Sequence, residues 1–254
     1  MPDTPLRQRI SIAEINAALG EEKRLDIFYN QIPVYFIFRP IGLVFCILFH
    51  RLGLSPITVT SLGLLLALMQ PFIAFFAANS FPQSSEFAGA LALGLTLAVL
   101  EILDAVDGDL ARATGQTSAL GGLMDAITDQ VKKFVYLITL GALIQFETTE
   151  TLFGLGHFGL AFGLGTGGLL LLARVTRDSA KTTDKQDVYP FRRSGRKSFS
   201  QLMFHSLASL EYAVSILLPV FAWFQSTDIL LACLFIYALS DFMLSFVLAL
   251  QSKR

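Results

Sequence analysis

Long apolar segments dominate this chain and decide what it can fold into. Six of them are long enough, at about 1.5 Å of helical rise per residue, to cross a hydrocarbon layer of about 30 Å. They cover residues 57–78, 88–113, 120–146, 152–174, 202–225 and 229–250. Hydrophobic residues make up 54% of the chain and charged residues only 15%, unlike a soluble domain. We therefore expect an all-α integral membrane protein with six transmembrane helices.

A further apolar run, residues 32–52, precedes these segments. Arg39 and Pro40 interrupt it in the middle. We therefore assign the run to an N-terminal interfacial amphipathic helix on the membrane surface, with residues 10–18 as a shorter amphipathic piece before it. The expected parts are an interfacial segment, a six-helix catalytic domain and a cytoplasmic tail: 1–56, 57–250 and 251–254.

Basic residues are distributed unevenly among the loops. The three loops that would lie on one side of the membrane hold no Lys or Arg, namely 79–86, 147–151 and 226–228. Because cytoplasmic loops carry the excess of basic residues, we expect both termini and the active site on the cytoplasmic side of a bacterial inner membrane. A seventh crossing would move basic residues near the N-terminus to the outside. The net charge of −1 gives no reason to expect nucleic acid as a partner.

The fourth apolar segment is rich in glycine. Gly159, Gly163 and Gly167 recur at every fourth position, so a helix would present them on one face. Residues 154–159 also match the GxGxxG pattern, but a dinucleotide site needs a preceding strand that this chain does not offer. We interpret the glycines as a helix-packing face that is also a candidate seam for a homodimer.

Four carboxylates stand within the second and third segments, which form the hairpin 88–146. Asp104 and Asp107 are spaced i,i+3, whereas Asp125 and Asp129 are spaced i,i+4, so each pair shares one helix face. Asp104 and Asp129 each lie about 12 Å from the hairpin turn and should meet at one depth. Ionisable groups at membrane depth are costly and mark functional sites. Four convergent carboxylates predict a site for divalent metal.

The residues beside the aspartates indicate the ligand. Gly108 and Ala111 continue the acidic face as a trough without bulky side chains, which a flat ring can enter. Arg112 at its mouth has a planar guanidinium suited to phosphate oxygens. Metal, arginine and trough together suit a nucleotide diphosphate, and the indicated reaction is substitution at phosphorus.

The combined pattern resembles the signature of the CDP-alcohol phosphotransferase family of membrane enzymes. It reads Asp104-x2-Asp107-Gly108-x2-Ala111-Arg112-x8-Gly121-x3-Asp125-x3-Asp129. The segment from Pro56 to Thr60 resembles the family's P-N-x-x-T motif, with Ile57 in place of asparagine. The resemblance implies a cytoplasm-facing site, usually in a dimer, where an acceptor hydroxyl attacks the phosphate next to the alcohol and CMP departs.

The resemblance also implies roles for individual residues. Two Mg²⁺ or Mn²⁺ ions would be bound by Asp104, Asp107, Asp125 and Asp129. Asp129 would also act as the general base. The CDP-alcohol would be bound by Thr60, Asp107, Gly108, Ala111, Arg112, Ser118 and Gly121. Ser118 serves equally well as the N-cap of the third helix. The residue after Asp129 is Gln130 rather than the Lys or Arg of several subfamilies, so their acceptor specificity does not transfer.

The substrates are less constrained than the reaction. CDP-diacylglycerol is the expected donor, and transfer from CDP-choline or CDP-ethanolamine to diacylglycerol is the alternative. Candidate residues for a small hydroxyl acceptor are Lys133, Arg174, Arg177 and Glu211. Lys133 would either neutralise substrate phosphate or extend towards the interface, and Glu211 either line the site or tie two helices together. A membrane prenyltransferase and a cation transporter are the competing functions.

Overall fold

The computed structural model describes residues 10–147, 155–181 and 212–251, and the elements in these ranges are all helical. Five described helices are long and apolar enough to cross a membrane. They are Val34–Arg51, Pro56–Ser80, Pro82–Ala113, Gly159–Ser179 and Thr227–Val247. The expected all-α integral membrane architecture is thereby confirmed.

Four of the six predicted segments begin and end within three residues of an observed helix. These helices are α4 (Pro56–Ser80), α5 (Ser85–Ala113), α6 (Ala119–Glu147) and α9 (Thr227–Gln251). The fifth predicted segment, 202–225, is represented by the helix Tyr212–Trp223, and its first ten residues lie outside the described part of the chain.

Helix α7 (Gly159–Lys181) begins and ends later than predicted. A short 3₁₀ helix, Leu155–Phe158, precedes it. Its apolar run ends at Arg174, but the helix continues because Arg174 pairs with Asp178 one turn further, at 2.9 Å between Nε and Oδ2. Hydrophobicity therefore located the span but not its ends.

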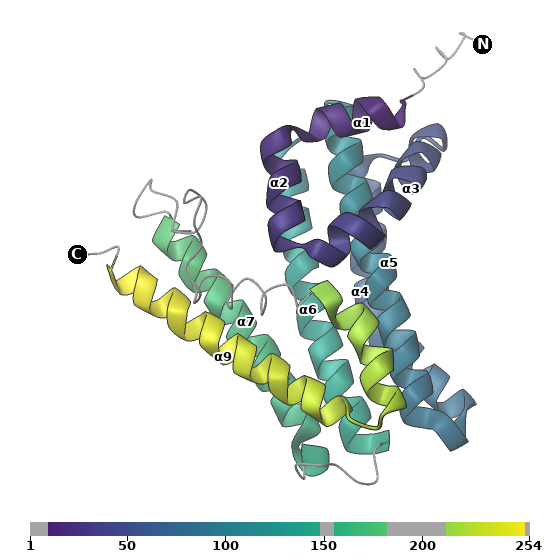
Figure 1. Ribbon diagram of the computed structural model, residues 1–254, viewed down its shortest axis with the longest axis vertical. Coiled ribbons are helices and arrows are strands. Elements are labelled where there is room, and N and C mark those ends of the chain that lie inside the picture. The colour runs from purple at the N-terminus through teal and green to yellow at the C-terminus, as the bar shows by residue number, and fades with distance from the viewer. Residues whose placement is uncertain (1–9, 148–154, 182–211, 252–254) are drawn as a thin grey trace.

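The N-terminal region holds more helix than the sequence predicted. Helix α1 (Ile12–Leu19) is capped by Ser11, and α2 (Glu21–Asn30) follows. The pKa of Glu14 is lowered because its carboxylate accepts hydrogen bonds from the N–H and the hydroxyl of Ser11. Both helices lie at the end of the molecule where α5 ends (Figure 1).

The break predicted at Arg39 and Pro40 is wrong. A π-helical turn, Val34–Phe38, leads directly into α3 (Arg39–Arg51), and Pro40 occupies the first turn, where its missing N–H costs little. The continuous segment Val34–Arg51 qualifies as a span by length and composition, where we expected an interfacial helix.

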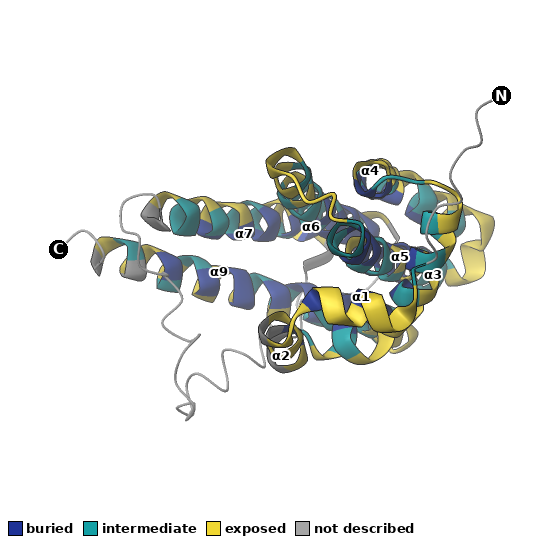
Figure 2. Cartoon of the chain, turned by 90° about the horizontal axis from the view of Figure 1, so that it is seen from above, coloured by how far each residue is buried: buried dark blue, intermediate teal, exposed yellow. Residues whose placement is uncertain are grey.

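The helices form two connected groups. Helices α4, α5 and α6 pack on one another, while α7 and α9 run side by side and contact the first group chiefly through α6 (Figures 1 and 2). Helices α1 and α3 pack on α5. Figure 2 shows that the outer face of α1 is exposed. The N-terminal helices and the α5–α6 turn thus occupy the same end of the molecule (Figure 1).

The glycine face of α7 packs against α6 of the same chain. A Cβ atom on Gly163 would collide with the carbonyl group of Leu137, and one on Gly159 would collide with the carbonyl oxygen of Gly141. The helix-packing interpretation is confirmed. Because α6 of the same chain covers this face, a homodimer seam through α7 would use another face of the helix, and the homodimer stays a prediction.

The turn between α5 and α6 is fixed by backbone hydrogen bonds. Gly115 has a positive φ of 66°, which favours glycine. Its N–H donates to the carbonyl of Arg112 at 3.3 Å, and the N–H of Gln116 donates to the carbonyl of Ala111 at 2.9 Å. This pair of bonds is the Schellman motif, which ends α5 and returns the chain as α6. The two aspartate pairs therefore face each other from adjacent helices.

Candidate active site

One cavity between α4, α5 and α6 brings all four motif aspartates together. Its lining comprises Val59, Thr60 and Gly63 from α4, Leu100, Leu103, Asp104 and Asp107 from α5, and Asp125, Thr128, Asp129 and Lys132 from α6. The two aspartate pairs thus meet at one depth, as the hairpin spacing predicted. The contribution of α4 matters because it closes the third side of the cavity.

Asp107 is held in place by Thr60. The Thr60 hydroxyl donates to Oδ2 of Asp107 at 2.6 Å, and both residues are buried. Asp104 and Asp125 are exposed at the opening and lie within hydrogen-bonding reach of each other. Thr60, which we predicted as a nucleotide contact, therefore orients a carboxylate of the cavity.

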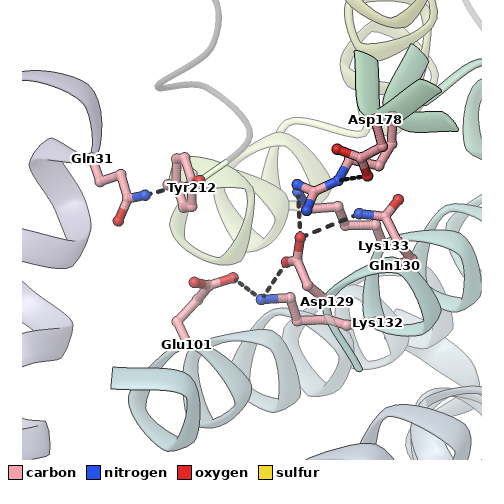
Figure 3. Close-up of polar contacts among 9 residues, drawn as sticks. Gln31, Glu101, Asp129, Gln130, Lys132, Lys133, Asp178 and Tyr212 are labelled. Atoms are coloured by element: carbon pink, nitrogen blue, oxygen red, sulfur yellow. Dashed lines mark hydrogen bonds and ion pairs between the residues drawn. The ribbon is translucent and has the colours of Figure 1, made fainter. Parts of the chain in front are cut away.

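Asp129 lies between two lysines of its own helix (Figure 3). Its Oδ2 atom is 3.0 Å from Nζ of Lys133, and its Oδ1 atom is 3.3 Å from Nζ of Lys132. Lys132 also reaches across to Oε1 of Glu101 on α5 at 3.0 Å. Lys133 thus points towards Asp129, and its expected role in neutralising substrate phosphate stays a prediction.

The donor set fits divalent metal by its chemistry. Carboxylate oxygens are the ligands that Mg²⁺ and Mn²⁺ prefer, and four carboxylates line one cavity. Within the ranges that the structure describes, no three Asp, Glu, His or Cys side chains lie close enough to share an ion. The metal role of the four aspartates stays a prediction.

The guanidinium of Arg112 lies over Gly108. A Cβ atom at position 108 would stand 3.0 Å from Nη2 and 3.1 Å from Nη1 of Arg112. Nη2 donates to Oδ1 of Asp109 at 2.7 Å. Position 108 is therefore small because it makes room for the arginine, whereas we had assigned that space to a flat ring. Ala111, on the next turn, is partly buried.

Ser118 acts as the N-cap of α6. Its hydroxyl accepts a hydrogen bond from the N–H of Gly121 at 3.0 Å, which is one of the two roles expected for it. A Cβ atom at Gly121 would lie 3.1 Å from this hydroxyl oxygen. Gly121 thus leaves space for the cap. Both residues stand at the mouth of the hairpin, where a direct contact with CDP stays a prediction.

A second cavity lies beyond Lys132. Leu97, Glu101, Lys132, Lys133, Tyr136, Tyr212, Val214 and Ser215 line it. Lys132 lines both cavities, and Asp129 lies beside it (Figure 3). Lys133 is therefore the acceptor candidate that the structure places next to the aspartates.

The other acceptor candidates are placed elsewhere or not described. Arg177 ties α7 to α9, with Nη1 at 2.6 Å from Oδ1 of Asp241 and at 2.9 Å from Oγ of Ser245. Arg174 pairs with Asp178 on its own helix. Glu211 lies outside the described residues.

Several residues around the site were missed from the sequence. Glu101 lies three residues before Asp104, and Lys132 lies three residues after Asp129, so both share the acidic faces and their pairing followed from that spacing. No spacing signal linked Tyr212 to the site, because it comes from a distant segment. Its hydroxyl accepts from Nε2 of Gln31 at 3.1 Å.

Comparison with known proteins agrees with the family resemblance of the aspartate motif. The sequence profile of the CDP-alcohol phosphatidyltransferase family matches residues 54–226. The chain is 34% identical over 100 residues to archaetidylinositol phosphate synthase of Pyrococcus horikoshii, covering 39% of this chain and 47% of that protein. It is 34% identical over 93 residues to cholinephosphotransferase 1 of Xenopus laevis, covering 36% of this chain and 23% of that protein.

The chain thus spans about half the length of the first relative and about a quarter of the second. The family match extends over more than half of the chain, from α4 through the aspartate hairpin to the residues before α9. It includes every residue that lines the cavity of the four aspartates. The chain therefore belongs to the CDP-alcohol phosphatidyltransferase family.

Proposed function

We propose that this chain transfers a phosphatidyl group from CDP-diacylglycerol to the hydroxyl of a small polar acceptor, with release of CMP, in phospholipid biosynthesis. The observation that carries the proposal is the cavity lined by Asp104, Asp107, Asp125 and Asp129 between α4, α5 and α6. Family membership supports the reaction class.

The donor side of the cavity carries the carboxylates that would hold metal ions against a pyrophosphate. The four aspartates would hold two Mg²⁺ or Mn²⁺ ions, which would neutralise the pyrophosphate and stabilise departing CMP. Thr60 keeps Asp107 oriented through the 2.6 Å hydrogen bond. Arg112 stands at the same helix end and offers guanidinium N–H groups to phosphate oxygens.

The transfer itself requires one proton acceptor near the incoming hydroxyl. The acceptor oxygen forms a bond to the phosphorus that bears the diacylglycerol, the bond between that phosphorus and the CMP oxygen breaks, and the hydroxyl proton passes to a carboxylate oxygen of Asp129. Asp129 suits this role because it lines the first cavity beside Lys132, which lines both.

The second cavity supports a small polar acceptor. Lys133, Tyr212 and Ser215 line it with an ammonium and two hydroxyl groups, which suit an alcohol that carries further polar or anionic groups. The names of the two relatives indicate inositol phosphate in one product and choline phosphate as the group transferred by the other. The first name supports a small polar acceptor, whereas the second corresponds to the alternative donor, CDP-choline.

The apolar surroundings of the site favour a lipid-linked donor. Helices α4 and α5, which are long and apolar enough to cross a membrane, line the cavity together with α6, so a donor that enters from the membrane could reach it without leaving the lipid layer. The distribution of basic residues supports a reaction on the cytoplasmic side, and we propose a bacterial inner membrane as its location. We propose a homodimer as the working form, with a seam away from the glycine face of α7.

A donor and acceptor screen tests the proposal. Purified protein is incubated with CDP-diacylglycerol or CDP-choline, with glycerol phosphate, serine, inositol, inositol phosphate, choline or diacylglycerol, and with Mg²⁺, Mn²⁺ or EDTA, and CMP release is measured. We expect CMP only from CDP-diacylglycerol, with one class of acceptor, in the presence of metal. Release only from CDP-choline with diacylglycerol would overturn the donor, and full turnover in EDTA would overturn the metal role.

A further inference from the structure

Asp109 is a carboxylate of the DGxxAR stretch that the aspartate signature does not include. It is 2% exposed and lies between two guanidinium groups. Its Oδ1 atom accepts from Nη2 of Arg112 at 2.7 Å, and its Oδ2 atom accepts from Nε of Arg39 at 3.4 Å. Arg39 in turn donates from Nη2 to Oδ1 of Asn16 at 3.2 Å. One line of polar contacts thus joins α1 and α3 to the arginine of the active site.

This arrangement fixes the orientation of Arg112. A buried carboxylate is stable only when it is paired and hydrogen-bonded, so losing the contact with either arginine would cost free energy. Gly108 leaves room for the guanidinium beside the helix. Asp109 therefore holds one edge of the Arg112 guanidinium. Because position 108 has no side chain, the guanidinium can lie against its own helix.

The orientation leaves one donor of Arg112 unused. Its Nε atom is buried and has no hydrogen-bond partner among the residues that the structure describes. A buried N–H without an acceptor costs free energy, and a phosphate oxygen would remove that cost. The unsatisfied donor is therefore a second observation, separate from the ion pair, that points to an anionic ligand at Arg112.

We propose that Asp109 is a positioning residue for the donor: it holds Arg112 in the orientation that binds donor phosphate, and Arg39 links this orientation to the N-terminal helices. The proposal rests on the proposed function, because it assumes that a CDP-alcohol binds at Arg112. It assigns the N-terminal helices a part in donor affinity.

The position of α2 supports this link. Surrounding protein atoms lower the pKa of Lys23, and the nearby guanidinium of Arg112 lowers it further, against the opposing effect of Asp125 and Asp104. Lys23 is thus within electrostatic range of the same arginine and of the carboxylates at the cavity mouth.

The substitution Asp109→Asn tests the proposal, because it keeps the size of the side chain and removes its charge. Asp228→Asn is the matched control, since Asp228 is also 2% exposed but lies at the start of α9. We expect Asp109→Asn to raise the Kd for CDP-diacylglycerol about tenfold, as measured by calorimetry in detergent, and to raise the donor KM with an unchanged acceptor KM. The control should keep the affinity of the wild type.

A double-mutant cycle shows whether Asp109 acts through Arg112. In an Arg112→Ala background, Asp109→Asn should cause no further loss of donor affinity. Losses that multiply, or a loss confined to kcat, would overturn the positioning role. A wild type that binds no CDP-diacylglycerol would instead overturn the proposed function, so the two failures are distinguishable.

A second variant covers the case in which Asp109→Asn does not fold. Arg39→Lys keeps the positive charge but cannot hold Asp109 and Asn16 together, because an ammonium lacks the guanidinium fork. We expect a smaller rise in the donor Kd, with thermal unfolding close to that of the wild type. An unchanged Kd in Arg39→Lys would contradict the link to the N-terminal helices.

Discussion

Glycine at position 108 is required by a side chain rather than by the backbone. The guanidinium of Arg112 occupies the space next to it, so that any Cβ atom there would stand 3.0 Å from Nη2. Such a distance forces the arginine to move. The glycine one helical turn before Arg112 thus has a packing cause, where sequence reasoning assigned the space to the ligand.

Gly108→Ala should weaken donor binding without changing the acceptor KM. The added methyl group displaces the arginine and breaks its contact with Asp109, for which we expect a rise of about tenfold in the donor KM. Gly122→Ala is the matched control, because nothing lies within 4 Å of a Cβ atom there. Equal donor KM values in steady-state kinetics of the two variants would contradict the placement of Arg112.

The buried lysine of α6 has a role that its position alone did not reveal. Lys132 is 4% exposed and bridges Glu101 and Asp129. The four aspartates and Arg112 could be predicted from the sequence because helical periodicity places them on one face. Helical spacing also places Glu101 and Lys132 on the acidic faces of α5 and α6, and their pairing follows once the two helices of the hairpin face each other.

Lys132→Met should destabilise the protein strongly. Removing the lysine leaves Glu101 buried without its cation, for which we expect a loss of about 3–5 kcal/mol in the free energy of unfolding. The double variant with Glu101→Met should regain most of that loss, because it removes the unpaired charge as well. Denaturant unfolding in detergent measures both, and a double variant no more stable than Lys132→Met would contradict the ion pair.

At the scale of elements, the contact between α6 and α7 connects the two helix groups. Helices α4, α5, α6 and α9 could be predicted because their apolar runs have the length of a span and end at polar turns. The ends of α7 and the continuity of α3 could not, because ion pairs extend them: Arg174 with Asp178, and Arg39 with Asp109. Charged residues were taken as boundaries, whereas Arg174 lies within α7 and pairs with Asp178 of the same helix, and Arg39 begins α3 and pairs with Asp109 of α5.

Gly163→Ala should loosen this contact. A methyl group there would collide with the carbonyl of Leu137 on α6, and overpacking of this kind costs about 1–3 kcal/mol. Gly168→Ala is the control on the same helix, because no atom lies within 4 Å of its Cβ position. Thermal unfolding in detergent should therefore show a lower Tm for Gly163→Ala and an unchanged or higher Tm for Gly168→Ala. The reverse order would contradict the packing of α7 on α6.

At the scale of the whole molecule, the distribution of basic residues predicts the orientation in the membrane. The turns before α5 and before α9 carry no Lys or Arg, whereas the α5–α6 turn follows Arg112 and lies at the same end as the N-terminal helices (Figure 1). Charge bias therefore predicts that the aspartate cavity lies nearer the cytoplasm.

Cysteine labelling checks this orientation. In a chain without Cys46 and Cys233, cysteines placed at Ser84 and Ser226 should react with an impermeant thiol reagent added outside the cell, and one at Gln116 should react only after the membrane is opened. Labelling of Gln116 but not Ser84 in intact cells would invert the topology.

The central claim is that the aspartate cavity binds a CDP-alcohol and that Asp129 receives the acceptor's proton. Asp129→Asn should keep the binding sites formed by Arg112 and by Asp104, Asp107 and Asp125, but it cannot take up the proton. Asp104→Asn should lose donor binding, because a carboxylate at the opening of the cavity is lost.

The decisive measurement is calorimetric binding of CDP-diacylglycerol beside CMP release, carried out on the wild type, Asp129→Asn and Asp104→Asn in the presence of Mg²⁺. The account predicts that Asp129→Asn binds the donor with nearly the affinity of the wild type and releases no CMP. CMP release near the wild-type rate from Asp129→Asn would contradict it.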